Sequence, residues 1–238
     1  MTRAATHRLD ESLLAPMAPF DRMERTQIRE VLDQATPRRL EEGATVFHEG
    51  ETAESFFLLL DGTIRVTHVT PTGENVAVLH IPAGQLFGFA PAIGRTHYPG
   101  TAEAASECLV LAWPVRLWDT FAAINGFAAE THATVGRRLA EMNDRIVEMA
   151  TQAVEQRVAS AVARLANQTG RRTNDGIEIG FPITRQDLSE LTGTTLYTVS
   201  RLLSAWERDG IVLSTRKRVV VTDPHRLVEL VEGRPGTK

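Results

Sequence analysis

The chain of 238 residues is long enough for two modest domains with separate cores, and its 42% hydrophobic and 24% charged residues exclude a fibrous or disordered protein. No run approaches the ~20 apolar residues of a membrane helix, and residues 1–16 lack the apolar core of a signal peptide. The one cysteine, Cys108, excludes an intramolecular disulfide and a four-cysteine zinc or iron–sulfur site within one chain, so we expect a cytoplasmic protein with no membrane partner.

Charge is divided unevenly along the chain, whose net charge is −4. Residues 151–238 hold 13 Lys and Arg against 10 Asp and Glu. Because the whole chain holds 26 and 30, residues 1–150 hold 13 against 20. The front is therefore acidic and the rear mildly basic, and we expect only the rear to contact the phosphates of a nucleic acid.

The first expected elements are a helix and then a series of short strands. Residues 13–35 are expected to be helical because Met23, Ile28, Val31 and Leu32 recur at roughly helical spacing. Short runs rich in Val, Ile, Phe and Leu then alternate with Gly, Pro, Asp and Thr, and the expected strands are residues 44–47, 56–60, 63–68, 76–81 and 109–113. This pattern indicates a jelly-roll-like sandwich or barrel, in which we expect Cys108 to be a buried thiol.

A heptad repeat on one helix face follows residue 125. Its apolar positions alternate spacings of four and three and are Ala128, His132, Val135, Leu139, Met142, Ile146, Met149 and Ala153. A narrow stripe with charged flanks favours a coiled-coil seam between two chains over packing of the helix on its own domain. We therefore expect a homodimer with contacts at Val135, Leu139, Met142, Ile146 and Met149. A second helix over residues 154–167 and a polar loop over residues 169–180 are expected next.

Residues 181–223 have the pattern of a helix-turn-helix followed by a hairpin. Thr184 and Asp187 form a capping box that begins a short helix, and Gly193 lies in the turn after it. Thr194 or Thr195 then caps a second helix that ends near residue 209. Two short helices joined by such a turn are typical of DNA-binding proteins, and the hairpin over residues 211–222 is the expected wing.

The second helix of such a motif lies in the major groove with its N-terminal residues at the base edges. Arg201 is the expected bidentate reader of guanine, whereas Leu196 offers only apolar contact, for instance to a thymine methyl. Two residues of the first helix and three wing cations are expected to hold phosphates, which sets the register without reading sequence. The expected DNA-binding residues are Arg185, Gln186, Thr195, Leu196, Tyr197, Thr198, Ser200, Arg201, Arg216, Lys217 and Arg218.

Three stretches of the chain resemble the CRP/FNR family, which includes the cyclic-AMP receptor and the fumarate–nitrate regulators. Residues 49–66, with the run FFLLLDGTIRV, look like the family's β-roll signature. Residues 136–139, Gly-Arg-Arg-Leu, resemble the start of its dimer helix. Residues 183–188, and 193–201 with the sequence GTTLYTVSR, resemble its helix-turn-helix. The resemblance covers nearly the whole chain.

The resemblance implies an α+β chain in three parts. These are an effector-sensing β-roll (jelly-roll-like) domain over residues 1–124, a dimerisation helix over 125–153 and a winged helix-turn-helix DNA-binding domain over 154–238. It implies a transcription regulator, not an enzyme, that binds double-stranded DNA as a homodimer on a palindromic operator and contacts RNA polymerase. An effector is expected between the β-roll and the dimer helix, near Phe87, Gly88, Phe89, Met142 and Asn143.

Three departures from the family pattern limit which effectors and which DNA bases we expect this chain to recognise. The family usually has a glutamate that accepts from cytosine four residues before Arg201, where this chain has Tyr197. Cyclic-nucleotide binders have a glutamate at the position of Phe89, and residues 98–101, YPGT, replace their Arg–Ser pair. We therefore expect no cation at a cyclic phosphate, and we do not expect cyclic AMP as the effector. A single cysteine also excludes the FNR-type iron–sulfur cluster.

Haem is an open alternative as a cofactor. Residues 98–104, YPGTAEA, resemble family members that respond to nitrogen oxides, some of which bind haem. A haem needs an axial ligand, for which His97 and His132 are the candidates, and the same two residues are the candidates for any metal. The other interpretation of each is an ordinary solvated or hydrogen-bonded histidine.

Two other functions remain as alternatives. A jelly-roll can be a metal-dependent, cupin-like enzyme, although the histidines of the expected barrel are scattered and the sequence has no nucleophile elbow or phosphate loop. A winged helix can also serve as a protein-interaction module. Arg201 and the basic wing favour DNA over that alternative.

Overall fold

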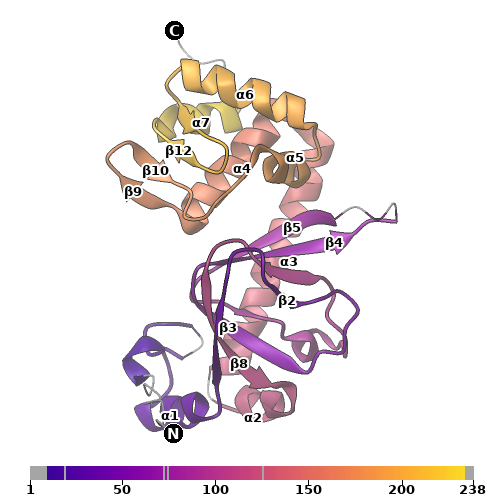
Figure 1. The fold of residues 1–238 in the computed structure, drawn as a ribbon, viewed down its shortest axis with the longest axis vertical. Helices are drawn as coiled ribbons and strands as arrows, with labels where there is room; N and C mark the ends of the chain where they lie inside the picture. The colour runs from indigo at the N-terminus through magenta and orange to yellow at the C-terminus, as the bar shows by residue number, and fades with distance from the viewer. Residues whose placement is uncertain (1–9, 19, 72, 74, 125, 234–238) are drawn as a thin grey trace, which may run out of the picture.

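The computed structural model describes residues 10–233 except residues 19, 72, 74 and 125. A β-rich N-terminal part and a helical C-terminal part lie at opposite ends of the long axis, and the long helix α3 runs beside the first part toward the second (Figure 1). The described residues leave out residues 1–9, which belong to the segment in which no signal peptide is expected. They also leave out residue 125, where the dimer helix is expected to begin. Among the described ranges, no helix is long and apolar enough to cross a membrane.

Two four-stranded antiparallel sheets form the N-terminal β-roll. Their strand orders are β1–β8–β3–β6 and β2–β7–β4–β5. In chain order the strands are β1 (Thr36–Leu40), β2 (Thr45–Phe47), β3 (Ser55–Asp61), β4 (Thr63–Val69), β5 (Asn75–Pro82), β6 (Leu86–Phe87), β7 (Thr101–Ala104) and β8 (Cys108–Pro114). A shared apolar core holds the sheets together, with Phe57 stacked on Phe87 at a centroid distance of 5.1 Å. The expected jelly-roll-like architecture is confirmed.

Three of these strands have no counterpart in the sequence prediction. Strand β1 is exposed along almost its whole length, so it lacks the apolar alternation that marks a half-buried strand. Strand β6 has only two residues, and the buried positions of β7 are the small Ala102 and Ala104. Their partners in the sheets, rather than their own composition, make these segments strands.

The prediction of a single long helix over residues 13–35 is wrong. The 3₁₀ helix η1 (Glu11–Leu13) is followed by turns, and the helix α1 (Arg25–Asp33) begins only where Glu24 caps it, with the Glu24 amide donating to Gln27 Oε1 at 3.0 Å. Pro16 lies between the two helices and has no amide hydrogen to donate. The Trp113 indole then fixes α1 on the β-roll by donating to the Val31 carbonyl at 2.8 Å.

The chain leaves the β-roll through short helices and enters α3. The short helices are η2 (Ala90–Ile93), η3 (Val115–Leu117) and α2 (Trp118–Ala122). Gly126 then takes a φ of +89°, a left-handed conformation that suits glycine, and begins α3 (Phe127–Thr151). Only the first turns of α3 are anchored in the core, by Phe127, Thr131 and Thr134. The remaining turns lie along the β-roll.

The C-terminal part is a winged helix-turn-helix around its own apolar core. Its helices are α4 (Val154–Thr169), α5 (Arg185–Thr192), α6 (Leu196–Arg208) and α7 (Pro224–Val231). Its sheet has the order β11–β12–β10–β9, from β9 (Arg171–Thr173), β10 (Gly176–Glu178), β11 (Val212–Ser214) and β12 (Val219–Val221). The loop expected over residues 169–180 is therefore wrong, because β10 pairs with the wing strand β12 and draws β9 into the sheet.

Candidate functional site

Three hydrogen-bonded caps shape the helix-turn-helix. The Asp187 amide donates to Thr184 Oγ1 at 3.1 Å, and the Thr184 amide donates to Asp187 Oδ2 at 2.7 Å, which completes the expected capping box of α5. Gly193 ends α5 with a φ of +58°. The Thr198 amide then donates to Thr195 Oγ1 at 3.1 Å, so Thr195 rather than Thr194 caps α6. These caps determine the angle at which α6 leaves the turn.

The first turns of α6 present a polar and aromatic face to solvent. Val199, Leu202 and Leu203 are buried in the core of the C-terminal part. Tyr197 is 77% exposed and Leu196 is also exposed, and the helix is the outermost element of the C-terminal part (Figure 1). Arg201 is exposed and forms no hydrogen bond or ion pair with any residue in the described part of the chain. Its guanidinium is therefore free to bind an external acceptor.

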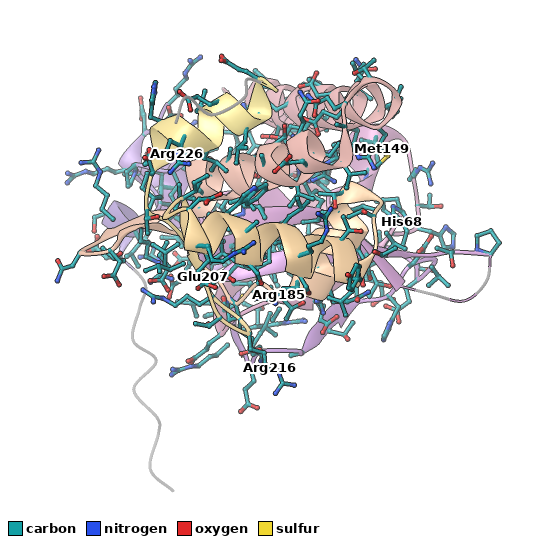
Figure 2. All side chains as sticks on the ribbon, turned by 90° about the horizontal axis from the view of Figure 1, so that it is seen from above. His68, Met149, Arg185, Glu207, Arg216 and Arg226 are labelled. Carbon is teal, nitrogen blue, oxygen red and sulfur yellow. The ribbon has the colours of Figure 1, made fainter. Side chains whose placement is uncertain are left out.

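The expected phosphate contacts of the first helix have partners within the protein. Arg185 is half-buried, and its Nη2 donates to Ser214 Oγ at 3.2 Å, which ties α5 to the wing strand β11. Gln186 is exposed, and its Nε2 donates to Glu190 Oε1 at 2.9 Å. Arg185 lies on the same side of the protein as α6, the side that faces the viewer in Figure 2.

The three cations expected at the wing tip have different surroundings. Lys217 Nζ lies 2.8 Å from Glu42 Oε1 of the β-roll. Arg218 contacts Glu178 at 2.9 Å and Asp175 at 3.6 Å, on and beside β10. Arg216 is exposed, has no ion pair with a residue that the structure describes, and projects from the edge of the molecule (Figure 2). Of the three, Arg216 is the cation that the fold leaves available for phosphate.

The expected seam of α3 lies mostly in solvent. Leu139 is 66% exposed, Ile146 is 65% exposed, and Met142 and Met149 are also exposed. Val135, in contrast, is half-buried and packs on the core of the β-roll. Four large apolar side chains on one exposed helix stripe are an unusual surface for a single chain.

A cavity of about 390 Å³ lies between the β-roll and α3. Four of the five expected effector residues, Phe87, Gly88, Phe89 and Met142, line it, whereas Asn143 is exposed and outside its lining. Most of the wall is apolar. The side chains that contribute it include Phe47, Val66, Val78, Leu79, Ile81, Ile93, Val135 and Leu139.

The expectation of no cation at the ligand site is wrong, because Arg138 and Arg145 of α3 line the cavity. Arg138 Nη2 donates to the Leu86 carbonyl at 2.8 Å, and its guanidinium lies 5.1 Å from the centroid of the Phe89 ring. Arg145 Nη1 donates to the Val78 carbonyl. The sequence shows that the two arginines share one helix face, since they are seven residues apart, but it does not show that this face meets a cavity.

Neither of the two candidate histidines, His97 and His132, lies at the cavity. His97 is exposed, with Nδ1 2.9 Å from Thr96 Oγ1, and His132 is exposed on α3. Neither lines the cavity, so a haem bound there by either residue does not fit the site. His68 does line it, but its Nδ1 lies 3.2 Å from Glu49 Oε1. Among the residues that the structure describes, no three His, Cys, Asp or Glu side chains are grouped to hold a metal.

Cys108 is buried, as expected, in β8. Its thiol donates to the carbonyl oxygens of Thr63 at 3.3 Å and Ser106 at 3.2 Å. Burial raises the pKa of the Cys108 thiol, which disfavours the reactive thiolate.

The C-terminal part packs on the β-roll through a small polar contact that sequence reasoning missed. Arg65 of β4 binds Asp187 of α5 at 3.0 Å and Glu103 of β7 at 3.2 Å. The Ala77 amide of β5 donates to Glu190 Oε2 at 3.2 Å. No local pattern relates Arg65 and Asp187, which are 122 residues apart. The contact places α5 directly on the β4–β5 hairpin (Figure 1).

His80 lies buried at this contact, stacked on Phe181 with ring centroids 4.7 Å apart. Desolvation lowers the pKa of His80 from 6.5 to about 4, against the opposing attraction of Asp187 and together with repulsion from Arg65 and Arg145. As the pH falls, His80 is therefore protonated near pH 6.5 in the unfolded chain but only near pH 4 in the folded chain. Protonation of His80 in the unfolded chain therefore lowers the free energy of unfolding as the pH falls from 6.5 toward 4, and it has no effect above pH 6.5.

Replacing His80 with phenylalanine should flatten this dependence, because phenylalanine keeps the stacked ring and has no proton to bind. Between pH 7.5 and pH 4, the wild-type chain should lose about 3 kcal/mol of unfolding free energy relative to His80→Phe, measured by urea denaturation at several pH values. The exposed His48 offers a control, since its imidazole has no partner among the described residues and His48→Gln should leave the pH profile of the wild-type chain unchanged. Parallel profiles for wild type and His80→Phe would contradict the assignment.

Comparisons with known proteins agree with this geometry in both parts of the chain. Residues 37–125 match the model of the cyclic nucleotide-binding domain, and residues 156–230 match that of the Crp-like helix-turn-helix domain. The chain is 25% identical over 230 residues to the fumarate and nitrate reduction regulatory protein of Escherichia coli (strain K12), covering 95% of this chain and 90% of that protein.

Solved structures share the fold over most of the chain. FixK2 from Bradyrhizobium japonicum has a TM-score of 0.71 at 21% identity, covering 86% of this chain and 99% of that one. A CRP-family transcriptional regulator from Thermus thermophilus has a TM-score of 0.70 at 22% identity, covering 83% of this chain and 97% of that one.

The β-roll, the long helix and the helix-turn-helix define a transcription regulator with a cyclic-nucleotide-binding-type domain and a DNA-binding domain. The chain belongs to the CRP/FNR family, as its sequence motifs predict.

Proposed function

We propose that this chain is a homodimeric regulator that binds a palindromic operator in the cytoplasm and responds to an effector in the cavity beneath α3. In this proposal residues 1–124 sense the effector, residues 125–153 form the dimer contact, and residues 154–238 bind DNA. RNA polymerase is the further partner that the family implies. The observation that carries the proposal is the exposed N-terminal face of α6, where Arg201 has no partner among the described residues.

The direction of α6 supports a reading role. Its buried face packs on the core of its own domain, so the opposite face is the one that enters a major groove. Thr195, Leu196, Tyr197 and Ser200 accompany Arg201 in the first turns, where base edges come within reach. Arg216 lies beyond the wing strand and supplies a cation for the backbone.

The apolar stripe of α3 supports the homodimer. Two copies of this stripe, related by a two-fold axis, cover each other's Leu139, Met142, Ile146 and Met149 in the manner of a coiled coil. A two-fold dimer carries two α6 helices, so its DNA site is expected to be a palindrome.

We do not propose cyclic AMP as the effector. The reason is no longer a missing cation but a missing carboxylate. Arginines are present in the cavity, but Phe89 occupies the position at which the family's nucleotide binders have a carboxylate. A ribose hydroxyl buried against an aromatic ring without a hydrogen bond is unfavourable. The largely apolar wall fits a ligand with fewer polar groups.

Selection from a pool of random 30-base-pair duplexes tests the proposal. In about 50 mM salt, where phosphate contacts are strong, the purified chain should enrich one inverted repeat whose half-sites are about one helical turn apart. A pool that stays random after repeated rounds, or a motif without two-fold symmetry, would count against a dimeric reader.

A further inference from the structure

The cavity beneath α3 combines an apolar body with charge at its helix side. Phe87, Ile81 and Val66 of the β-roll form part of the apolar wall, and Leu139 and Met142 of α3 close the other side. A volume of about 390 Å³ lies in the range that small-molecule sites occupy in proteins. A ligand that fills it therefore has a mainly hydrocarbon or aromatic surface.

Arg138 is a half-buried cation that has no ion pair with the residues that the structure describes. One of its nitrogens donates to the Leu86 carbonyl, whereas Nε is buried and has no acceptor among the described residues. No carboxylate of the described ranges lies within ion-pair distance of its guanidinium. Desolvation lowers the pKa of Arg138 to about 10, so it still carries its charge at neutral pH.

The other charged groups at the cavity leave a net positive charge there. Arg145 is a second cation, and its Nε is also buried without a partner among the residues described. Glu141 is the carboxylate in the lining, and its Oε1 accepts from Gln168 at 2.9 Å. His68 lies beside Glu49, which balances any charge on that imidazole. Glu148 binds Arg164 at 3.0 Å, so it does not neutralise Arg145 in an ion pair.

We infer that the cavity takes a small apolar carboxylate, with an aromatic or branched aliphatic body against the β-roll and its carboxylate at Arg138. Arg145, two helical turns farther along α3, adds positive potential without being the main contact. This inference rests on the proposed function, because it names the chemical class of the effector in the same cavity. A carboxylate at the guanidinium of Arg138 would supply the counter-charge that the described residues do not.

The geometry also connects such a ligand with α3. Arg138 and Arg145 flank the apolar seam formed by Leu139, Met142 and Ile146, and two of those seam residues, Leu139 and Met142, line the cavity as well. A ligand anchored at Arg138 therefore contacts the β-roll and the dimer helix at once. Differential contact with two conformations is what an effector needs in order to shift an equilibrium.

A pair of probes that differ only in charge tests the inference. 1-Naphthaleneacetate and its neutral amide, 1-naphthaleneacetamide, share one aromatic body, so the difference in their affinities isolates the carboxylate. By calorimetry at pH 7.5, we expect the wild-type chain to bind the acetate at least about tenfold more tightly than the amide. Arg138→Gln should remove most of the preference for the acetate, leaving the part that Arg145 supplies, and should leave the amide affinity unchanged. Arg145→Gln should produce a smaller loss.

Arg137 is the matched control for Arg138. It lies next to Arg138 on α3 but points outward, where it binds Glu130 at 2.9 Å. Arg137→Gln removes the same charge and should leave both probe affinities unchanged. Arg138→Lys keeps the charge and should retain part of the preference for the acetate, so the test stands even if Arg138→Gln fails to fold.

Four outcomes would overturn the inference: equal wild-type affinity for the two probes, no binding of either, an unchanged preference in Arg138→Gln, or tighter binding of cyclic AMP than of the acetate. None of them concerns DNA. Selection of a palindrome without any probe tests the proposed function separately, so the failure of one is distinguishable from the failure of the other.

Discussion

Replacing Leu139 and Ile146 together with glutamate is expected to convert the dimer into monomers and to abolish specific DNA binding. Both side chains are about two-thirds exposed in the single chain, at 66% and 65%, so the glutamates cost little there. In a two-fold seam the same changes place four carboxylates against apolar partners, and each buried, unpaired charge costs several kcal/mol. Sedimentation velocity at about 10 μM should give the mass of one chain.

Two exposed positions on α3 offer a control for this double variant. Ala140 and Val147 each follow a seam residue by one position and occupy the b positions of the heptad, which face away from a partner helix. Ala140→Glu combined with Val147→Glu adds the same two charges and should leave the dimer intact. The seam assignment would fail if the Leu139 and Ile146 variant stayed dimeric, or if both double variants dissociated alike.

Replacing Arg201 with alanine is expected to cost about 1–3 kcal/mol on the cognate site and to relax the choice of base at one pair in each half-site. The guanidinium has no partner among the described residues and lies on the exposed face of α6, so its removal leaves the domain core unchanged. Competition binding against a panel of single-base variants of the operator measures both the reduced affinity and the reduced discrimination.

Arg216 provides the matched comparison, because Arg216→Ala removes the same charge from the wing. It should weaken binding to all sequences alike and lower the salt slope by about one for each phosphate that the wing no longer neutralises. Lys217 is a less suitable control, since its Nζ already lies 2.8 Å from Glu42 of the β-roll. If Arg201→Ala weakened random and cognate DNA by the same factor, Arg201 would be a phosphate contact, and the reading role would pass to Tyr197 and Ser200.

Local patterns predict much of this molecule. The capping box of Thr184 and Asp187 and the glycine at the turn locate α5 and α6 within a residue of their observed bounds, because caps are short-range hydrogen bonds. The heptad repeat also indicates α3, because the repeat is a local pattern within one helix. In contrast, α1 begins later than its apolar spacing suggests, since Pro16 and the following turns interrupt the helix.

The features that sequence reasoning missed depend on distant segments. Strand β10 forms because β12, some forty residues later, offers it an edge. The Arg65–Asp187 contact joins the two parts of the molecule. Arg138 and Arg145 looked like ordinary charged flanks of a coiled coil, and only the packing of α3 on the β-roll places them at the cavity. A charge pattern predicts which residues share a helix face, but it does not predict which element packs against that face.

The most direct test of the account is the number of chains on one operator. Sedimentation velocity of the protein with a fluorescent duplex carrying the selected palindrome should give two chains for each duplex. A duplex with one half-site scrambled should bind at least about a hundredfold more weakly, since one recognition helix then loses its base contacts. One chain on each duplex, with the same affinity for the intact and the half-scrambled site, would contradict the account of a dimeric reader of palindromic DNA.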